Sequence, residues 1–151
     1  MKNKFLPLFL SLAFTFPLFA ADVPSDEDLS DLVLESLTAF NDGVVDNNFT
    51  DFLATMSAPA REQLTPEKLQ AGFQDFIAKK INISGIKDLE PTFDGKKIDA
   101  QGVLRVSGTY PTTPVKVHFA LGYVQEDEEW KLLGIKVDTN EDNPTDAQKK
   151  N

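Results

Sequence analysis

Residues 115–124 read VKVHFALGYV, and apolar side chains occupy every second position of this stretch. Successive side chains of a strand point to opposite faces, so this alternation predicts a strand with one buried face. Residues 102–110, GVLRVSGTY, alternate in the same way and predict a second strand of the same kind. Two such strands in succession, separated by the turn at 111–114, predict an antiparallel sheet with one apolar face.

Residues 130–137, WKLLGIKV, predict the last strand of this sheet, entered from a solvated acidic turn at 126–129. The alternation breaks here, because Leu132 falls on one face while Leu133 and Ile135 fall on the other. This pattern predicts a strand that is covered on both sides, near the middle of the sheet. Trp130, the only tryptophan, begins the strand, and we expect its ring to seal the sheet against a helix.

The segment before residue 102 completes the predicted meander. Residues 89–93 predict a short first strand, and Asp94-Gly95 is a typical hairpin turn. The second strand would then run from residue 98 to residue 110. The predicted sheet therefore has four antiparallel strands.

The N-terminal half has helical periodicity instead. Ser25 can cap a first helix whose apolar residues recur at steps of three and four: Leu29, Leu32, Val33, Leu37, Phe40 and Val44. Gly43 resembles a stop signal, but Val44 keeps the helical phase, so we expect this helix to reach Asn47 or Asn48. A short second helix is predicted at 49–56, ended by residues 57–59. Thr65-Pro66 starts a predicted third helix over 65–77.

The first twenty residues are typical of a secretory signal peptide. Lys2 and Lys4 precede an uncharged apolar stretch, and Ala20-Ala21 offers a small-residue cleavage site. The apolar stretch is shorter than the ~20 residues that span a bilayer, so we expect no stable membrane insertion. The sequence therefore predicts a periplasmic or secreted bacterial protein, with a signal peptide at 1–20, one domain at 21–139 and a disordered polar tail at 140–151.

Charge and composition exclude several classes of function. The chain of 151 residues has a formal net charge of −9, which makes nucleic acid a poor partner. It has no cysteine and a single histidine, so thiolate chemistry and a histidine-rich zinc site are not available. Asp138 begins a D-x-N-x-D pattern, but Asn143 and Lys149 stand where a calcium loop needs glycine and glutamate. We expect neither a metal nor a cofactor.

The order of elements resembles the NTF2-like (cystatin-like α+β) superfamily. The resemblance rests on AFNDGVVDNNFTDFLATMS and TPEKLQAGFQDFI in the helical half, and on GVLRVSGTY, VKVHFALGYV and EEWKLLGIKV in the sheet. It covers residues 25–139 and concerns architecture more than chemistry. It implies three helices packed on a curved sheet, which together form a cone with an apolar pocket.

The superfamily that the chain resembles includes ketosteroid isomerases, polyketide cyclases and scytalone dehydratases. Such enzymes place an acid, a histidine or a tyrosine inside the cone. The inward positions of this sheet offer only Tyr110 and Tyr123, which we predict to line a ligand pocket. His118 and Asp99 have the opposite parity and are expected on the polar face. We therefore predict no catalytic residue.

Two hypotheses follow from these residues. The preferred one is an exported, non-catalytic NTF2-like module that binds a small apolar ligand, a peptide or an envelope protein. Val103, Ala120 and Val124 on the outer sheet face would allow a homodimer through that face. The alternative is a small isomerase, cyclase or dehydratase whose base comes from a helix or loop.

Overall fold

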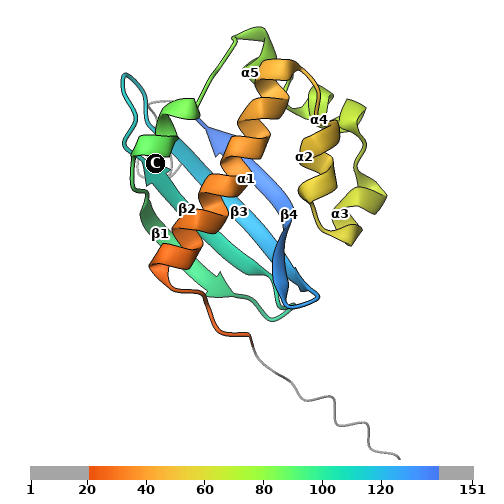
Figure 1. The fold of residues 1–151 in the computed structure, drawn as a ribbon, viewed down its shortest axis with the longest axis vertical. Coiled ribbons are helices and arrows are strands. Elements are labelled where there is room, and N and C mark those ends of the chain that lie inside the picture. The colour runs from red at the N-terminus through yellow and green to blue at the C-terminus, as the bar shows by residue number, and fades with distance from the viewer. Residues whose placement is uncertain (1–20, 140–151) are drawn as a thin grey trace, which may run out of the picture.

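Four antiparallel strands form one sheet in the order β1-β2-β3-β4 (Figure 1). The strands are β1 (Thr92–Ile98), β2 (Leu104–Tyr110), β3 (Val117–Glu126) and β4 (Glu129–Asp138). This computed structural model describes residues 21–139, so the predicted signal peptide and polar tail lie outside the described residues. The α+β class and the four-stranded antiparallel sheet are confirmed.

One long helix, α1 (Asp26–Asp46), crosses a face of the sheet, and the shorter helices lie at the β4 side and beyond (Figure 1). They are α2 (Thr50–Thr55), α3 (Ala58–Gln63), α4 (Pro66–Gly72) and α5 (Gln74–Ala78), and a 3₁₀ helix, η1 (Ser84–Asp88), precedes the sheet. As predicted, α1 continues through Gly43, and it ends where Asn47 adopts the left-handed conformation.

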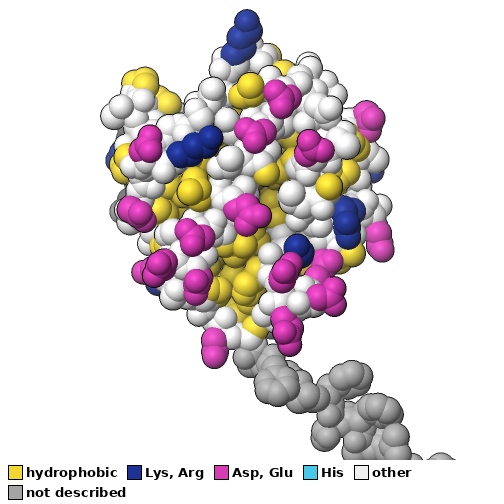
Figure 2. Space-filling model, viewed as in Figure 1, with side chains coloured by type: hydrophobic (Ala, Val, Ile, Leu, Met, Phe, Trp, Pro, Cys, Tyr) yellow, Lys and Arg dark blue, Asp and Glu magenta, His cyan; other side chains and the backbone are white. Residues whose placement is uncertain are grey.

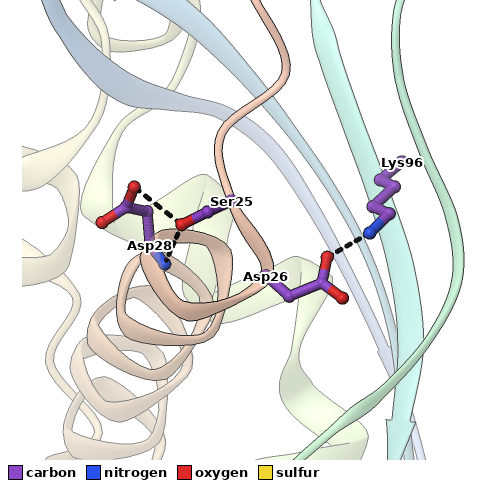
Figure 3. A network of polar contacts seen from close by, with 4 residues as sticks. All are labelled: Ser25, Asp26, Asp28 and Lys96. Atoms are coloured by element: carbon purple, nitrogen blue, oxygen red, sulfur yellow. Dashed lines mark hydrogen bonds and ion pairs between the residues drawn. The ribbon is translucent and has the colours of Figure 1, made fainter.

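The start of α1 is fixed to the sheet as well as capped (Figure 3). The Ser25 hydroxyl accepts a hydrogen bond from the Asp28 backbone N–H at 3.2 Å, which satisfies a free donor of the first turn. It also donates to the Asp28 carboxylate at 2.9 Å. Asp26 forms an ion pair with Lys96 of β1, so the first turn of α1 is held against the edge of the sheet.

The helix count differs from the prediction, since residues 21–139 contain five α-helices where three were expected. The second helix ends before residues 57–59, as predicted, but these residues also begin an unpredicted helix: Ser57 caps α3, and Pro59 lies in its first turn, where a missing N–H costs nothing. The helix predicted at 65–77 is divided at Phe73, which ends α4 and precedes α5. Pro59 and Pro66 each lie in the first turn of a helix, after a capping hydroxyl from Ser57 or Thr65.

The predicted hairpin turn at Asp94-Gly95 is wrong. Both residues lie inside β1, where the register with β2 shifts between Phe93 and Gly95. The turn lies instead between Asp99 and Val103, where the Asp99 carboxylate accepts the N–H groups of Gln101 at 2.9 Å and Val103 at 3.0 Å. An aspartate that bonds its own following backbone makes a turn without the Asp-Gly pair.

The position of the last strand is also corrected. β4 is an edge strand and not a central one. Its broken alternation comes from a register shift, because Gly122 pairs with Gly134 while Tyr123 pairs with Leu132. Leu133 is therefore an extra residue that forms a β-bulge. Because of this bulge, Leu132 before it and Ile135 and Val137 after it point to the same face of the sheet.

The edge of β4 is partly covered by the chain between α2 and α3. Met56 forms a parallel bridge with Leu132, and the Ser57 N–H donates to the Leu132 carbonyl at 2.8 Å. The Ala58 N–H donates to both carboxylate oxygens of Glu126, at 3.0 and 2.9 Å. These bonds join the helical half to the β3–β4 hairpin and protect part of an exposed strand edge.

The core has an aromatic half between the helices and a mainly aliphatic half beneath the sheet. Phe40 of α1 lies 4.7 Å from Phe73 and 5.6 Å from Phe76, ring centre to ring centre, both edge to face. Edge-to-face contacts of this kind stabilise beyond the area they bury. The inward residues of β2 and β3 complete the core, and the buried ones are Leu104, Val106, Tyr110, Val117, Phe119, Leu121 and Tyr123.

Gly108 of β2 provides the first test of this packing. A Cβ at Gly108 would lie 2.3 Å from the Thr92 carbonyl oxygen and 2.9 Å from Cζ of Phe119. We expect Gly108→Ala to lower the free energy of unfolding by about 1–3 kcal/mol, because neither neighbour can move without repacking. Urea denaturation followed by circular dichroism measures this change.

Gly134→Ala is the matched control in the same sheet. A Cβ at Gly134 meets no atom within 4 Å, so its unfolding free energy should stay within about 0.5 kcal/mol of the parent value. Equal effects of the two substitutions would contradict the close approach of β1 to Gly108.

Candidate ligand groove

A groove of about 650 Å³ lies between α1 and the β3–β4 hairpin. Leu32, Ser36 and Ala39 of α1 line one wall, because residues three and four apart share a helix face. Tyr123 and Leu132 line the other, and their pairing across β3 and β4 places both on the inner face. The volume is in the range of small-molecule sites.

Trp130 also lines this groove, from the start of β4. Its ring is half-buried, packs against the core and lines the groove together with Leu132. The ring therefore does contact the core as expected, but part of it stays exposed to the groove. Pro24 and Thr55 complete the lining from the chain before α1 and from the end of α2.

The rim of the groove carries more negative than positive charge. Asp28, Glu35 and Glu129 line it together with one basic residue, Lys131. The Glu129 carboxylate lies 3.0 Å from the Lys131 ammonium and, as the main cause, raises the pKa of that lysine. Figure 2 shows apolar side chains in the hollow beside α1, with Asp and Glu side chains around it. The groove thus combines an apolar interior with an acidic rim.

Tyr123 lines the groove from β3 and is fully buried. Its hydroxyl lies 2.8 Å from the Ser36 hydroxyl, which itself donates to the Leu32 carbonyl at 2.9 Å. Burial raises the Tyr123 pKa, although the Ser36 hydrogen bond acts in the opposite direction. The phenol therefore stays protonated near neutral pH and serves as a hydrogen-bonding group.

Tyr110, the other predicted pocket residue, lies elsewhere on the inner face. It pairs with Val117 at one end of the β2–β3 ladder, whereas Tyr123 pairs with Leu104 at the other end. The Tyr110 ring is buried 5.7 Å from the ring of Phe119 and is not among the residues that line the groove. Burial raises the pKa of Tyr110 to about 12. The Tyr110 and Tyr123 hydroxyls therefore do not form one site, because only Tyr123 lines the groove.

His118 and Asp99, both predicted on the polar face, lie outside the groove. His118 is half-buried on the outer face, and its Nδ1 is 2.9 Å from the Thr109 hydroxyl of the neighbouring strand. Asp99 lies in the β1–β2 turn, where the Val103 N–H bond is the main cause that lowers its pKa. Neither residue lines the groove.

Sequence reasoning missed Ser36 and Glu35 as groove residues. Ser36 falls on the apolar face of α1 between Val33 and Phe40, and a serine in such a stripe signals a buried partner. Glu35 carries no signal of this kind, because an exposed acid on a helix is ordinary. Among residues 21–139, no group of three or more His, Cys, Asp or Glu side chains could hold a metal ion.

Comparisons with protein-family models, with curated proteins and with solved structures found no match to this chain. Within residues 21–139, no helix combines the length and the apolar character needed to cross a membrane.

Trp130→Ala tests the half-burial of the ring. We expect a loss of about 1–3 kcal/mol in unfolding free energy, less than the 3–5 kcal/mol typical of a fully buried aromatic residue. Trp130→Phe should retain most of the contact with the core. Urea denaturation followed by far-ultraviolet circular dichroism measures both, and a loss above 4 kcal/mol for the alanine variant would contradict the half-exposed position.

The buried tyrosines predict how stability depends on alkaline pH. Folding raises both pKa values above the ~10 of an unfolded tyrosine, so the folded state holds these protons more tightly. Their contribution to stability is complete below pH 10 and is lost as the pH rises through about 12, the folded-state pKa of Tyr110. Unfolding free energy measured at increasing pH above 9 should therefore fall.

Tyr110→Phe and Tyr123→Phe should each make this alkaline fall less steep, because each removes one titrating group. An equally steep fall in both variants would show that other groups cause it.

Proposed function

We propose that the protein is an exported NTF2-like module that binds a small, mainly apolar ligand in the groove between α1 and the β3–β4 hairpin. The observation that supports this proposal is the groove itself, which is lined by Trp130, Leu32 and Leu132 among others. An apolar interior with a few polar groups is the usual composition of a small-molecule site.

The acidic rim favours a ligand that carries a positive charge. Asp28, Glu35 and Glu129 outnumber Lys131 around the groove, and Lys131 is already paired with Glu129. A cationic group at the rim would meet uncompensated carboxylates, while its apolar part would contact Leu32, Leu132 and Trp130. The Trp130 ring could also contact the cation through its face.

Export is part of this proposal. It rests on the basic residues, the apolar stretch and the Ala20-Ala21 site at the start of the chain, and it predicts a periplasmic or secreted protein. A small isomerase, cyclase or dehydratase is the less favoured function. A carboxylate base would have to be Glu35, Asp28 or Glu129, and all three are exposed, whereas desolvation is what usually activates such a base.

Binding of decyltrimethylammonium tests the groove, with Trp130 emission as the signal. Below its micelle concentration, this cation should change the emission of the only tryptophan in a saturable way. Ala39→Phe should weaken binding at least tenfold, about 1.4 kcal/mol, because the larger side chain fills the groove. Glu35→Lys should weaken it as well by reversing a charge on the rim.

Ala100→Phe is the matched control, because it makes the same change at an exposed position in the β1–β2 turn, outside the groove lining. Circular dichroism establishes that each variant is folded. Equal affinity in Ala39→Phe and Ala100→Phe would refute a ligand site in the groove. If Ala39→Phe alone loses affinity, native mass spectrometry of protein purified from its own envelope would identify the natural ligand.

A further inference from the structure

A second hollow, a trough of about 780 Å³, lies on the outer face of the sheet. Its floor consists of small residues in two neighbouring rows of the strand register. One row contains Gly122 and Gly134, and the other contains Gly95, Ser107 and Ala120. A Cβ at Gly134 would meet no atom within 4 Å, so the space above this strand is open. Side chains of Val103 and Leu133 add apolar surface.

The basic residues of the trough stand at its two sides. Lys97 and Arg105 pair across β1 and β2, and Lys136 lies on β4 in the row of Ala120. The trough crosses the sheet from β1 to β4, which is three strand spacings or about 14 Å. Lys96 also lines it, but its ammonium is paired with Asp26 on the side of α1 (Figure 3).

The lining contains four basic residues and no acid, in a chain whose net charge is −9. Arg105 uses its Nε for Asp99, at 2.8 Å, in the adjacent turn. Lys97 and Lys136 form no ion pair within residues 21–139. The outer trough is therefore positive where the groove beside α1 is negative, and the two hollows favour ligands of opposite charge.

We propose that the outer trough binds an anionic amphiphile of the fatty-acid class. The carboxylate would be held by the cations at one side of the sheet, with Lys97 and Arg105 together offering more donors than Lys136 alone. The alkyl chain would lie across Gly134 and Ala120 of the floor and against the Val103 side chain, which stands beside Gly122. A cationic amphiphile has no acid to meet in this trough.

A second copy of the chain fits this face less well. A twofold dimer through the outer face would bring the same patch of each subunit together. Lys97, Arg105 and Lys136 would then face cations of the partner, and like charges across an interface cost free energy. The predicted homodimer through this face is thus disfavoured by charge, and the experiment below separates it from ligand binding.

Titration with dodecanoate below its micelle concentration tests the proposal, followed by the backbone amide signals of ¹⁵N-labelled protein. We expect saturable shifts at Gly122 and Gly134, with Trp130 emission unchanged because that residue lines the other hollow. The double variant Lys97→Glu/Lys136→Glu should bind dodecanoate at least tenfold more weakly. Gly134→Leu should also weaken binding, because its side chain would occupy the open space.

Lys87→Glu is the control for charge, because it makes the same change on η1 outside the trough. The single variant Lys97→Glu, which changes the charge by the same amount, should also weaken binding. The proposal is overturned if Lys87→Glu weakens binding as much as Lys97→Glu does, or if decyltrimethylammonium shifts the same glycines with equal affinity. It is also overturned if tetraglutamate binds as tightly, because charge alone would then suffice. Shifts of Gly122 and Gly134 that follow protein concentration without dodecanoate would instead establish the homodimer.

Discussion

The burial of α1 is the constraint on which the remaining structure depends. Leu29, Val33 and Leu37 have no exposed surface, and Phe40 one turn later joins the ring cluster of the shorter helices. The same helix holds the sheet through Ser36 and Tyr123, and it holds η1 through Asn41, whose side-chain oxygen accepts the Ile83 N–H at 2.8 Å. A single helix therefore contacts both halves of the core.

The position of α1 also divides the surface into two electrostatic regions. On the side of α1, acids surround an apolar groove, whereas the opposite face of the sheet has a trough lined by bases. The net charge of −9 does not indicate a basic surface, because acids outnumber bases over the whole chain. The alternation of side chains along the strands produces this division. Each inward apolar residue of β2 and β3 is followed by a residue that points outward, and in the two rows of the trough these outward residues are small or basic.

Tertiary contacts around the β3–β4 hairpin determine the shape of the groove. Asp127 and Glu128 both have positive φ, which a tight two-residue turn requires, and Glu126 is free to bond the start of α3. The bulge at Leu133 then turns Trp130 and Leu132 inward together with Val137. Without the bulge, either Trp130 and Leu132 or Val137 would point to the outer face. The groove would then lose part of its lining, or the core beneath it would lose Val137.

The sequence by itself determined the fold class, the extent of α1 and the inner face of β2 and β3, because periods of 3.6 and 2 are local and strong. It also placed Tyr123 on the inner face. Only the tertiary structure decided which strand lies at the edge, because strand order depends on pairing between distant segments, and Leu133 changes the parity that the sequence presents. The separation of Tyr110 from Tyr123 follows from the β2–β3 register, which places them at opposite ends of the ladder. The groove residues Ser36 and Glu35 follow from how α1 crosses the sheet. No spacing along the chain encodes that crossing, since it results from the packing of Phe40 and its neighbours.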